Sequence, residues 1–204
     1  MRKKILDHFE KVDKKLFNAI DAEVKNFLLD GDKKTSNECF VSLCKSIVGQ
    51  QLSGKAARSI YFRFEALFPK KKVNPKKLIE FTEHQLRAVG ISYGKARALL
   101  SVAEHVLNKK VSFLNIHTRD ENEIREMLIQ IYGVGPWTIE MFLMFSIGRE
   151  DIFSTKDLGL QKGIQKIYNL KDRPDERKME RLSKKWSPYR TYASIILWNC
   201  VDNQ

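Results

Sequence analysis

A glycine-rich turn and one downstream carboxylate are the residues of this chain whose types and spacing could do chemistry. The turn holds Gly133 and Gly135, Pro136 follows directly, and Asp157 lies 22 residues after Gly135. Glycine reaches positive φ without strain and lets another backbone come close. Amides at the start of a helix favour an anion, because the helix dipole is positive there. The pattern predicts a hairpin that grips a phosphate and an aspartate that acts on one nucleotide.

Each of these features also has a purely structural interpretation. Glycines serve ordinary helix–helix turns, and aspartate is a common N-cap. By position alone Asp157 would be such a cap, and a cap can still act as a catalyst. The net charge of +12 adds weight to the phosphate interpretation, because it indicates a polyanionic partner, with nucleic acid ahead of an acidic membrane.

Composition excludes several other classes of protein. With 204 residues and 43% hydrophobic content, the chain can bury a core in one domain or two small ones. No apolar run approaches the roughly 20 residues of a bilayer span, and the N-terminus lacks an apolar signal core. Three cysteines, Cys39, Cys44 and Cys200, are too few and too scattered for a zinc or four-cysteine iron–sulfur site, and they suit a reduced interior.

Apolar residues recur at helical spacing along almost the whole chain, and no alternating strand pattern exceeds a few residues. The sequence is therefore predicted to be all-α. The turn at 70–77 is predicted to be a basic loop, solvated rather than DNA-binding, and 171–185 is a charged stretch. Ser53 is predicted to be the N-cap of a helix that ends at 67, and Asp120 and Glu123 to form the capping box of a helix that ends at Ile131. Another helix is predicted to end at 86–90. The remaining helices are predicted over 40–48, 93–108, 158–170 and 189–198, and from Pro136 to 145.

Four ordered segments resemble the helix-hairpin-helix DNA glycosylases, over about residues 35 to 200. The hairpin segment 131–138 looks like theirs, and Asp157 falls where their catalytic aspartate falls. The segment 47–57 is similar to the one that bears the DNA-wedging residue in 3-methyladenine glycosylase II, and 186–198 resembles that family's closing helix. The chain is expected to be a compact form without the N-terminal mixed α/β domain of some bacterial members.

The resemblance implies a monofunctional enzyme that hydrolyses the bond between an alkylated base and deoxyribose in double-stranded DNA. Asp157 would stabilise an oxocarbenium-like sugar and orient the attacking water. Bifunctional relatives place a nucleophilic lysine where this chain has Trp137, so a Schiff-base lyase step lacks its amine. No cofactor is expected beyond a monovalent cation held by the Gly133 and Gly135 carbonyls.

The resemblance also implies contacts for the everted nucleotide. Gln51, with Gln50 beside it, would occupy the wedge position, although both could be a polar helix end. Trp137, Trp198 and Met141 match positions that line the base pocket, and a cationic alkylated base stacks well on indole; plain core positions remain the alternative for the tryptophans. The residues expected to hold the DNA backbone are Gly133, Gly135, Thr138, Lys55, Tyr93, Gly94 and Lys95.

The expected architecture is two helical lobes with the active cleft between them. One lobe would comprise residues 39–149, and the other residues 1–38 with 150–204. The protein is expected to be a monomer that binds double-stranded DNA containing alkylated bases and no membrane, in the cytoplasm of a bacterium or the nucleus of a eukaryote. Two alternatives stay open: a glycosylase for deaminated or oxidised bases, and a non-catalytic helix-hairpin-helix DNA-binding module.

Overall fold

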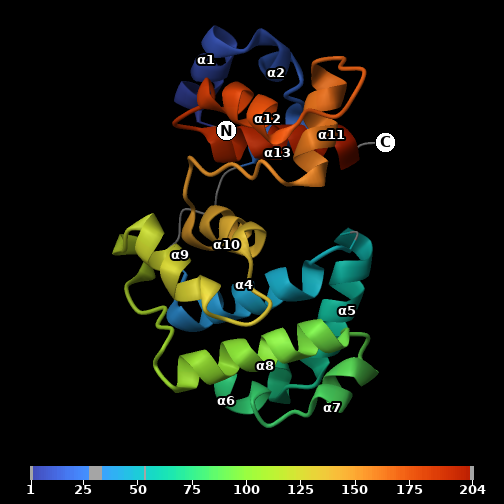
Figure 1. Cartoon of the computed structure of the whole chain (residues 1–204), viewed down its shortest axis with the longest axis vertical. Helices are drawn as coiled ribbons and strands as arrows, with labels where there is room; N and C mark the ends of the chain where they lie inside the picture. The colour runs from blue at the N-terminus through green and yellow to red at the C-terminus, as the bar shows by residue number, and fades with distance from the viewer. Residues whose placement is uncertain (1, 28–33, 53, 203–204) are drawn as a thin grey trace. The chain divides into compact units, whose positions relative to one another are not determined.

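The computed structural model describes residues 2–27, 34–52 and 54–202. Every regular element in those ranges is helical, which confirms the predicted all-α class (Figure 1). The chain divides into two compact units, one of residues 1–31 with 148–204 and the other of residues 32–147. Within the described ranges, no helix is both long and apolar enough to cross a membrane.

The unit of residues 32–147 is built around α4, which packs against α5, α8 and α10. Residues Phe40, Leu43 and Ile47 recur on one face of α4 at helical spacing and are buried. A capping box of Thr35 and Glu38 begins the helix. The elements are α4 (Ser36–Gly49), α5 (Gly54–Ala66), η1 (Pro69–Lys71), α6 (Pro75–Leu78), α7 (Glu83–Ala88), α8 (Tyr93–Leu107), η2 (Ile116–Thr118), α9 (Glu121–Ile129), α10 (Pro136–Phe142) and the π-helical turn η3 (Leu143–Ile147).

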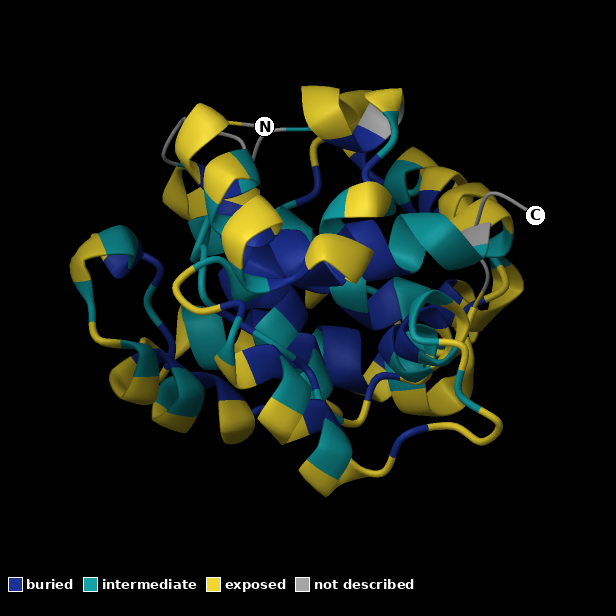
Figure 2. Cartoon of the chain, turned by 90° about the horizontal axis from the view of Figure 1, so that it is seen from above, coloured by how far each residue is buried: buried dark blue, intermediate teal, exposed yellow. Residues whose placement is uncertain are grey.

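The other unit brings helices from both ends of the sequence onto one core. Its elements are α1 (Lys3–Val12), α2 (Lys14–Asn18), α3 (Ala22–Asn26), α11 (Leu158–Ile167), α12 (Glu176–Lys184) and α13 (Arg190–Asp202). Helix α13 is central, because it packs against α2, α3, α11 and α12. Ile5, Phe9 and Ile196 have no exposed surface and belong to one core cluster. In Figure 2 individual helices carry both buried and exposed residues, as amphipathic helices do.

Several local predictions need correction. The 70–77 segment is not all loop, because η1 ends in it and α6 begins at Pro75 with Asn74 as its N-cap. The stretch 171–185 is charged as described, and the structure adds that it contains α12, which Asp175 caps. Asp120 caps α9 as predicted, but its side chain accepts from the Asn122 amide rather than forming a box with Glu123, and α9 ends at Ile129. The helix after Asp157 ends at Ile167. The N-cap predicted at Ser53 lies outside the described residues.

Asp13 is the buried polar centre of the unit that contains both chain ends. Its carboxylate accepts hydrogen bonds from the Tyr168 hydroxyl, from Trp186 Nε1 at 2.8 Å and from the Leu16 amide at 3.2 Å. Lys185 Nζ lies 2.7 Å from Asp13 Oδ2. Burial opposes ionisation, but the hydrogen bonds from Lys185, Tyr168 and Trp186 outweigh it and hold the pKa of Asp13 below its usual value. One ionised side chain thus joins the start of α2 to the ends of α11 and α12.

Asp13→Asn should destabilise this unit by about 2–4 kcal/mol, because it leaves the Lys185 ammonium without its charge partner and one donor unmatched. A lowered folded pKa stabilises the fold above the unfolded pKa, and that contribution is lost as the pH falls through the folded value. The difference between wild type and variant should therefore be full at neutral pH and shrink below about pH 4. Urea unfolding followed by circular dichroism measures it.

Asp7→Asn is the matched control for this variant. It makes the same chemical change on an exposed position of α1 in the same unit. Equal unfolding midpoints for the two variants would contradict the role assigned to Asp13.

Candidate active site

Asp157 is the N-cap of α11 and is almost buried, with 9% of its surface exposed. Its Oδ1 accepts the Leu160 amide at 2.8 Å and Trp198 Nε1 at 2.9 Å. The first bond is the ordinary cap that sequence reasoning proposed as the structural alternative. The second joins the predicted catalytic carboxylate to a predicted base-contacting tryptophan. The cap and the indole together fix the orientation of the carboxylate.

Two glycines on one face of α11 allow this contact. A Cβ on Gly159 would lie 2.8 Å from Trp198 Cδ1 and 3.0 Å from Asp157 Oδ1. A Cβ on Gly163, one helical turn later, would lie 2.5 Å from the Leu197 carbonyl oxygen of α13. Both distances are too short for real atoms, so only glycine lets α11 approach α13 this closely. Sequence reasoning missed both residues, although two glycines four positions apart in a predicted helix are a signal for close packing.

In the other unit the hairpin is built by two glycines with different duties. Gly133 has φ +77°, and a Cβ there would lie 2.6 Å from Ala98 Cβ, so the turn needs glycine both for its conformation and for its packing on α8. Gly135 precedes Pro136 as the N-cap of α10, with φ −104°, and has no side chain to cap the helix. A Cβ on Gly135 would meet no protein atom within 4 Å. The protein's own packing therefore does not require glycine at position 135.

Gln50 and Gln51 lie next to each other but do different things. Gln50 Nε2 donates to the Gly133 carbonyl at 3.1 Å and to Thr138 Oγ1 at 2.9 Å, so it joins the end of α4 to the hairpin. Gln51 is exposed and has φ +55°, a left-handed conformation that costs a non-glycine residue about 1 kcal/mol or more. The chain thus presents the Gln51 side chain outward from a strained turn, whereas Gln50 stays attached to the protein.

The start of α8 completes this group of segments. Lys95 Nζ donates to the carbonyls of Val48 at 2.9 Å and Gln50 at 2.7 Å. Burial lowers the pKa of Lys95. A cation at the C-terminal end of α4 suits the negative end of that helix's dipole, and it holds the turn that carries Gln51. Tyr93 is more than half exposed, with the Arg87 guanidinium 3.7 Å from its ring centre, and a Cβ on Gly94 would meet nothing within 4 Å.

Three segments predicted to bind DNA therefore lie together in one unit: the turn at 50–51, the start of α8 and the hairpin. The DNA contacts predicted for them remain predictions. The Thr138 side chain is buried and bonded to Gln50, and Lys95 is bonded to backbone carbonyls, so their first duty is to shape this surface. Lys55 is exposed in the first turn of α5.

Trp137 and Met141 lie one helical turn apart on α10. Trp137 is half-buried, and Met141 is buried with 7% of its surface exposed. Helix α10 passes directly into the π-helical turn η3. Such turns are frequent at functional sites. The contacts predicted between these two residues and a base remain predictions.

The hairpin carbonyls were expected to hold a monovalent cation. The Gly133 carbonyl accepts Gln50 Nε2, and the Gly135 carbonyl accepts the Ile139 amide at 3.1 Å. A carbonyl oxygen has two lone pairs, so each keeps capacity for one further ligand. These residues fit a weakly held cation, which would add positive charge beside a phosphate.

Residues 44–188 match the HhH-GPD superfamily of base excision DNA repair proteins. The chain belongs to this superfamily. DNA-3-methyladenine glycosylase 1 of Schizosaccharomyces pombe is 32% identical over 79% of this chain and 72% of its own length. The solved structure of the 3-methyladenine DNA glycosylase Mag1 of the same yeast, in complex with abasic DNA, superposes with a TM-score of 0.85 at 26% identity and covers 97% of this chain and 96% of that chain. A DNA-3-methyladenine glycosidase of Bacillus halodurans gives a TM-score of 0.75 at 34% identity, with coverage of 99% and 90%.

In this HhH-GPD protein, Gly159→Ala should move the Trp198 indole from Asp157, because the new Cβ would overlap both side chains. We expect base excision under single-turnover conditions to slow by about tenfold or more, since a small misplacement of a catalytic group is costly. Gly54→Ala is the control, because a Cβ there meets only the flexible end of Arg58 at 3.4 Å. Unchanged excision by Gly159→Ala would show that the indole does not position the carboxylate.

The different duties of Gln50 and Gln51 can be separated by two variants. Gln51→Ala should leave the free energy of unfolding unchanged within about 0.5 kcal/mol, because the side chain is exposed, and should weaken binding to a duplex with an abasic site. Gln50→Ala should lower stability by about 1 kcal/mol, because it removes two hydrogen bonds to the hairpin. Fluorescence anisotropy and urea unfolding measure the two effects, and a reversed pattern would contradict the assignment.

Proposed function

We propose that this protein is a monofunctional DNA glycosylase, which removes alkylated bases from double-stranded DNA by hydrolysis in base excision repair. The observation that carries the proposal is the carboxylate of Asp157, fixed by Trp198 and the start of α11 in a chain of the HhH-GPD superfamily. Relatives that bear the name DNA-3-methyladenine glycosylase support the choice of alkylated bases. A DNA-binding module without activity would have no need for the indole to orient this aspartate.

The reaction breaks the bond between the base nitrogen and C1′ of deoxyribose. The base leaves with the bonding electron pair, and the sugar acquires oxocarbenium character that an ionised carboxylate stabilises. A water oxygen then bonds to C1′ and a proton of that water passes to a general base, a role that we propose for the Asp157 carboxylate. An alkylated base that is already cationic leaves as a neutral molecule, so one carboxylate is sufficient catalysis.

The selectivity proposed for a cationic base rests on indole. The Trp198 edge is held at Asp157 by the 2.9 Å hydrogen bond, so a base stacked on its ring would have its glycosidic bond near the carboxylate. Electron-rich indole faces attract cations by about 0.5–2 kcal/mol. An oxidised or deaminated base is neutral and gains less from this stacking, which is why we favour alkylated bases over the alternative lesions.

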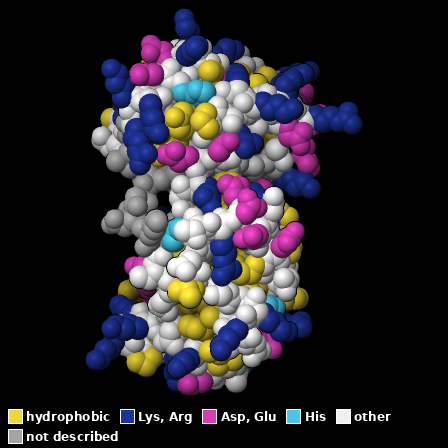
Figure 3. Space-filling model, turned by 90° about the vertical axis from the view of Figure 1, so that its left-hand side faces the viewer, with side chains coloured by type: hydrophobic (Ala, Val, Ile, Leu, Met, Phe, Trp, Pro, Cys, Tyr) yellow, Lys and Arg dark blue, Asp and Glu magenta, His cyan; other side chains and the backbone are white. Residues whose placement is uncertain are grey.

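The grip on the DNA backbone is proposed for the hairpin and its neighbours. Gly135 is glycine although neither its φ nor its surroundings in the protein require it, which fits close approach of an external backbone. Such contacts position the enzyme and carry no sequence information. On the face drawn in Figure 3, lysine and arginine side chains stand in several separate groups, with acidic ones near some of them. The hairpin geometry, rather than the charge pattern, is therefore the basis on which we propose the binding surface. We also propose that the protein acts as a monomer.

Asp157→Asn tests the proposal with little disturbance of the fold, because asparagine is an equally good N-cap and its oxygen can accept the same two hydrogen bonds. Release of base from duplexes that each carry one lesion should fall by at least about a hundredfold, while affinity for the DNA changes less than about twofold. The panel should contain 3-methyladenine, 7-methylguanine, hypoxanthine and 8-oxoguanine.

Wild type should release the two methylated bases fastest and leave an intact strand until alkali is added, since Trp137 stands where bifunctional relatives place their lysine. Full turnover by Asp157→Asn would refute the assigned carboxylate. Faster release of hypoxanthine or 8-oxoguanine would favour the alternative glycosylases, and no release of any base would favour the binding module.

A further inference from the structure

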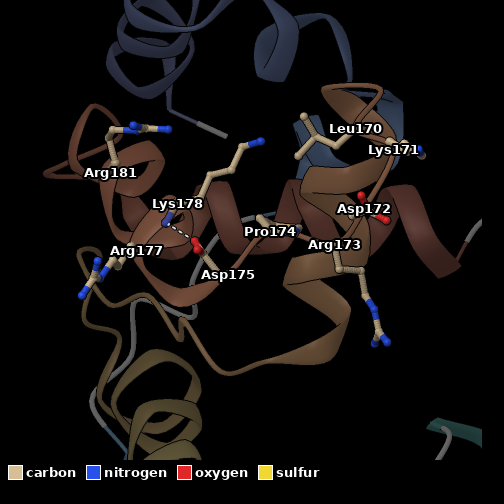
Figure 4. A pocket seen from close by; sticks show the side chains of 9 residues that line it. All are labelled: Leu170, Lys171, Asp172, Arg173, Pro174, Asp175, Arg177, Lys178 and Arg181. Carbon is tan, nitrogen blue, oxygen red and sulfur yellow. Dashed lines mark hydrogen bonds between the residues drawn. The ribbon is translucent and has the colours of Figure 1, made fainter.

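A basic cavity of about 500 Å³ lies in the unit that holds Asp157, between the end of α11 and the first turns of α12. This volume is within the range of ligand clefts, roughly 300–1,000 Å³. Its lining is dominated by cationic side chains, as Figure 4 shows. The lining residues are Leu170, Lys171, Asp172, Arg173, Pro174, Asp175, Arg177, Lys178 and Arg181.

Five of these nine side chains are cationic and two are carboxylates. Asp175 Oδ1 accepts the Lys178 amide at 2.8 Å as the cap of α12, so one carboxylate is already committed to the helix start. Among the ion pairs found in the described part of the chain, none includes Arg173, Arg177 or Arg181. Like charges gathered in one cavity repel, so the cavity favours an anion that neutralises several of them.

The chemistry of the lining indicates a phosphate. Three of the five cations are arginines, whose planar guanidinium matches two phosphate oxygens at once. Pro174 is buried and anchors the loop, whereas Arg173 and Arg177 are exposed. In Figure 4 the side chains of Arg173 and Arg177 extend to one side of the ribbon, and those of Lys178 and Arg181 to the other. A ligand longer than a single ion is needed to meet both pairs, as a sugar–phosphate chain is.

The cavity adjoins the catalytic carboxylate through one ion pair. Lys156 Nζ lies 3.8 Å from Glu176 Oε1, and Lys156 directly precedes Asp157 while Glu176 begins α12. Both side chains are well exposed, so the pair adds little stability, but it brings the side chain that precedes Asp157 to the first turn of α12. A DNA molecule with one nucleotide at Asp157 would thus have its neighbouring phosphates near this cavity.

We propose that the α11–α12 cavity binds backbone phosphates of the DNA that flanks the excised nucleotide. The cavity would hold the DNA backbone in addition to the hairpin. The proposal rests on the proposed function only in taking the lesion to lie at Asp157. An acidic protein segment is the other ligand that this charge could attract. Glu176 stands between the lining residues Asp175 and Arg177 and pairs with Lys156, the residue before Asp157, and this neighbourhood favours DNA.

The test is the salt dependence of DNA binding by Arg173→Gln/Arg177→Gln. Each neutralised phosphate contributes about 0.9 to the slope of log Kobs against log salt. The double variant should flatten this slope by about 1–2 and weaken binding several-fold at 0.1 M salt. Its single-turnover excision rate at saturating DNA should stay within about twofold of wild type, because the chemical step is untouched. Urea unfolding should confirm that the exposed substitutions leave the fold intact.

Lys3→Gln/Lys11→Gln is the matched control, since it removes two exposed positive charges from α1 of the same unit. Equal slopes for the two double variants, or a wild-type slope in the cavity variant, would overturn the proposal. The proposal would also be overturned if the cavity variant lost binding to polyglutamate but kept the wild-type salt slope of DNA binding, because the cavity would then serve an acidic protein. If wild type showed the steep slope yet released no base, the proposed function would fail and the cavity would still stand.

Discussion

The hydrogen bond from the Trp198 indole to the Asp157 carboxylate is the interaction on which the proposed chemistry depends. It spans two helices that can meet only because Gly159 and Gly163 carry no side chains where α11 crosses α13. The same carboxylate oxygen caps α11, so the helix start, the contact between α11 and α13 and the proposed catalytic geometry share one atom. The cost of this arrangement is an almost buried aspartate, and the two donors offset that cost.

In the other unit, the hydrogen bonds of two side chains hold the surface proposed for DNA in place. Gln50 joins the end of α4 to the hairpin, and Lys95 joins it to the start of α8. Three segments distant in the sequence are thereby fixed around the strained turn that presents Gln51. The polar residues that build this surface are satisfied within the protein, which leaves backbone groups and exposed side chains to meet the ligand. Such preorganisation limits the ordering that binding must impose.

The interpretation as a glycosylase also explains why one fold carries two kinds of polar centre. Asp13 is surrounded by Lys185, Tyr168 and Trp186, and burial together with these partners makes it a structural ion. Asp157 has amide and indole donors, and neither of them carries a full charge. Hydrogen bonds from neutral groups orient a carboxylate without cancelling its charge, which suits the role proposed for Asp157.

The sequence by itself determined the helical class, several helix starts and the hairpin, because helical spacing, glycine turns and caps are local properties of the chain. Its local pattern made Asp157 an N-cap, and the choice of Asp157 as a catalyst came from the family resemblance and stays a prediction. The sequence did not separate Gln50 from Gln51, reveal the need for Gly159 and Gly163, or find α12 and the basic cavity beside it. Only the tertiary structure decided these, since each depends on which atoms lie within a few ångströms across elements far apart in the sequence. Local patterns fix what a segment becomes, whereas packing fixes which side chains meet.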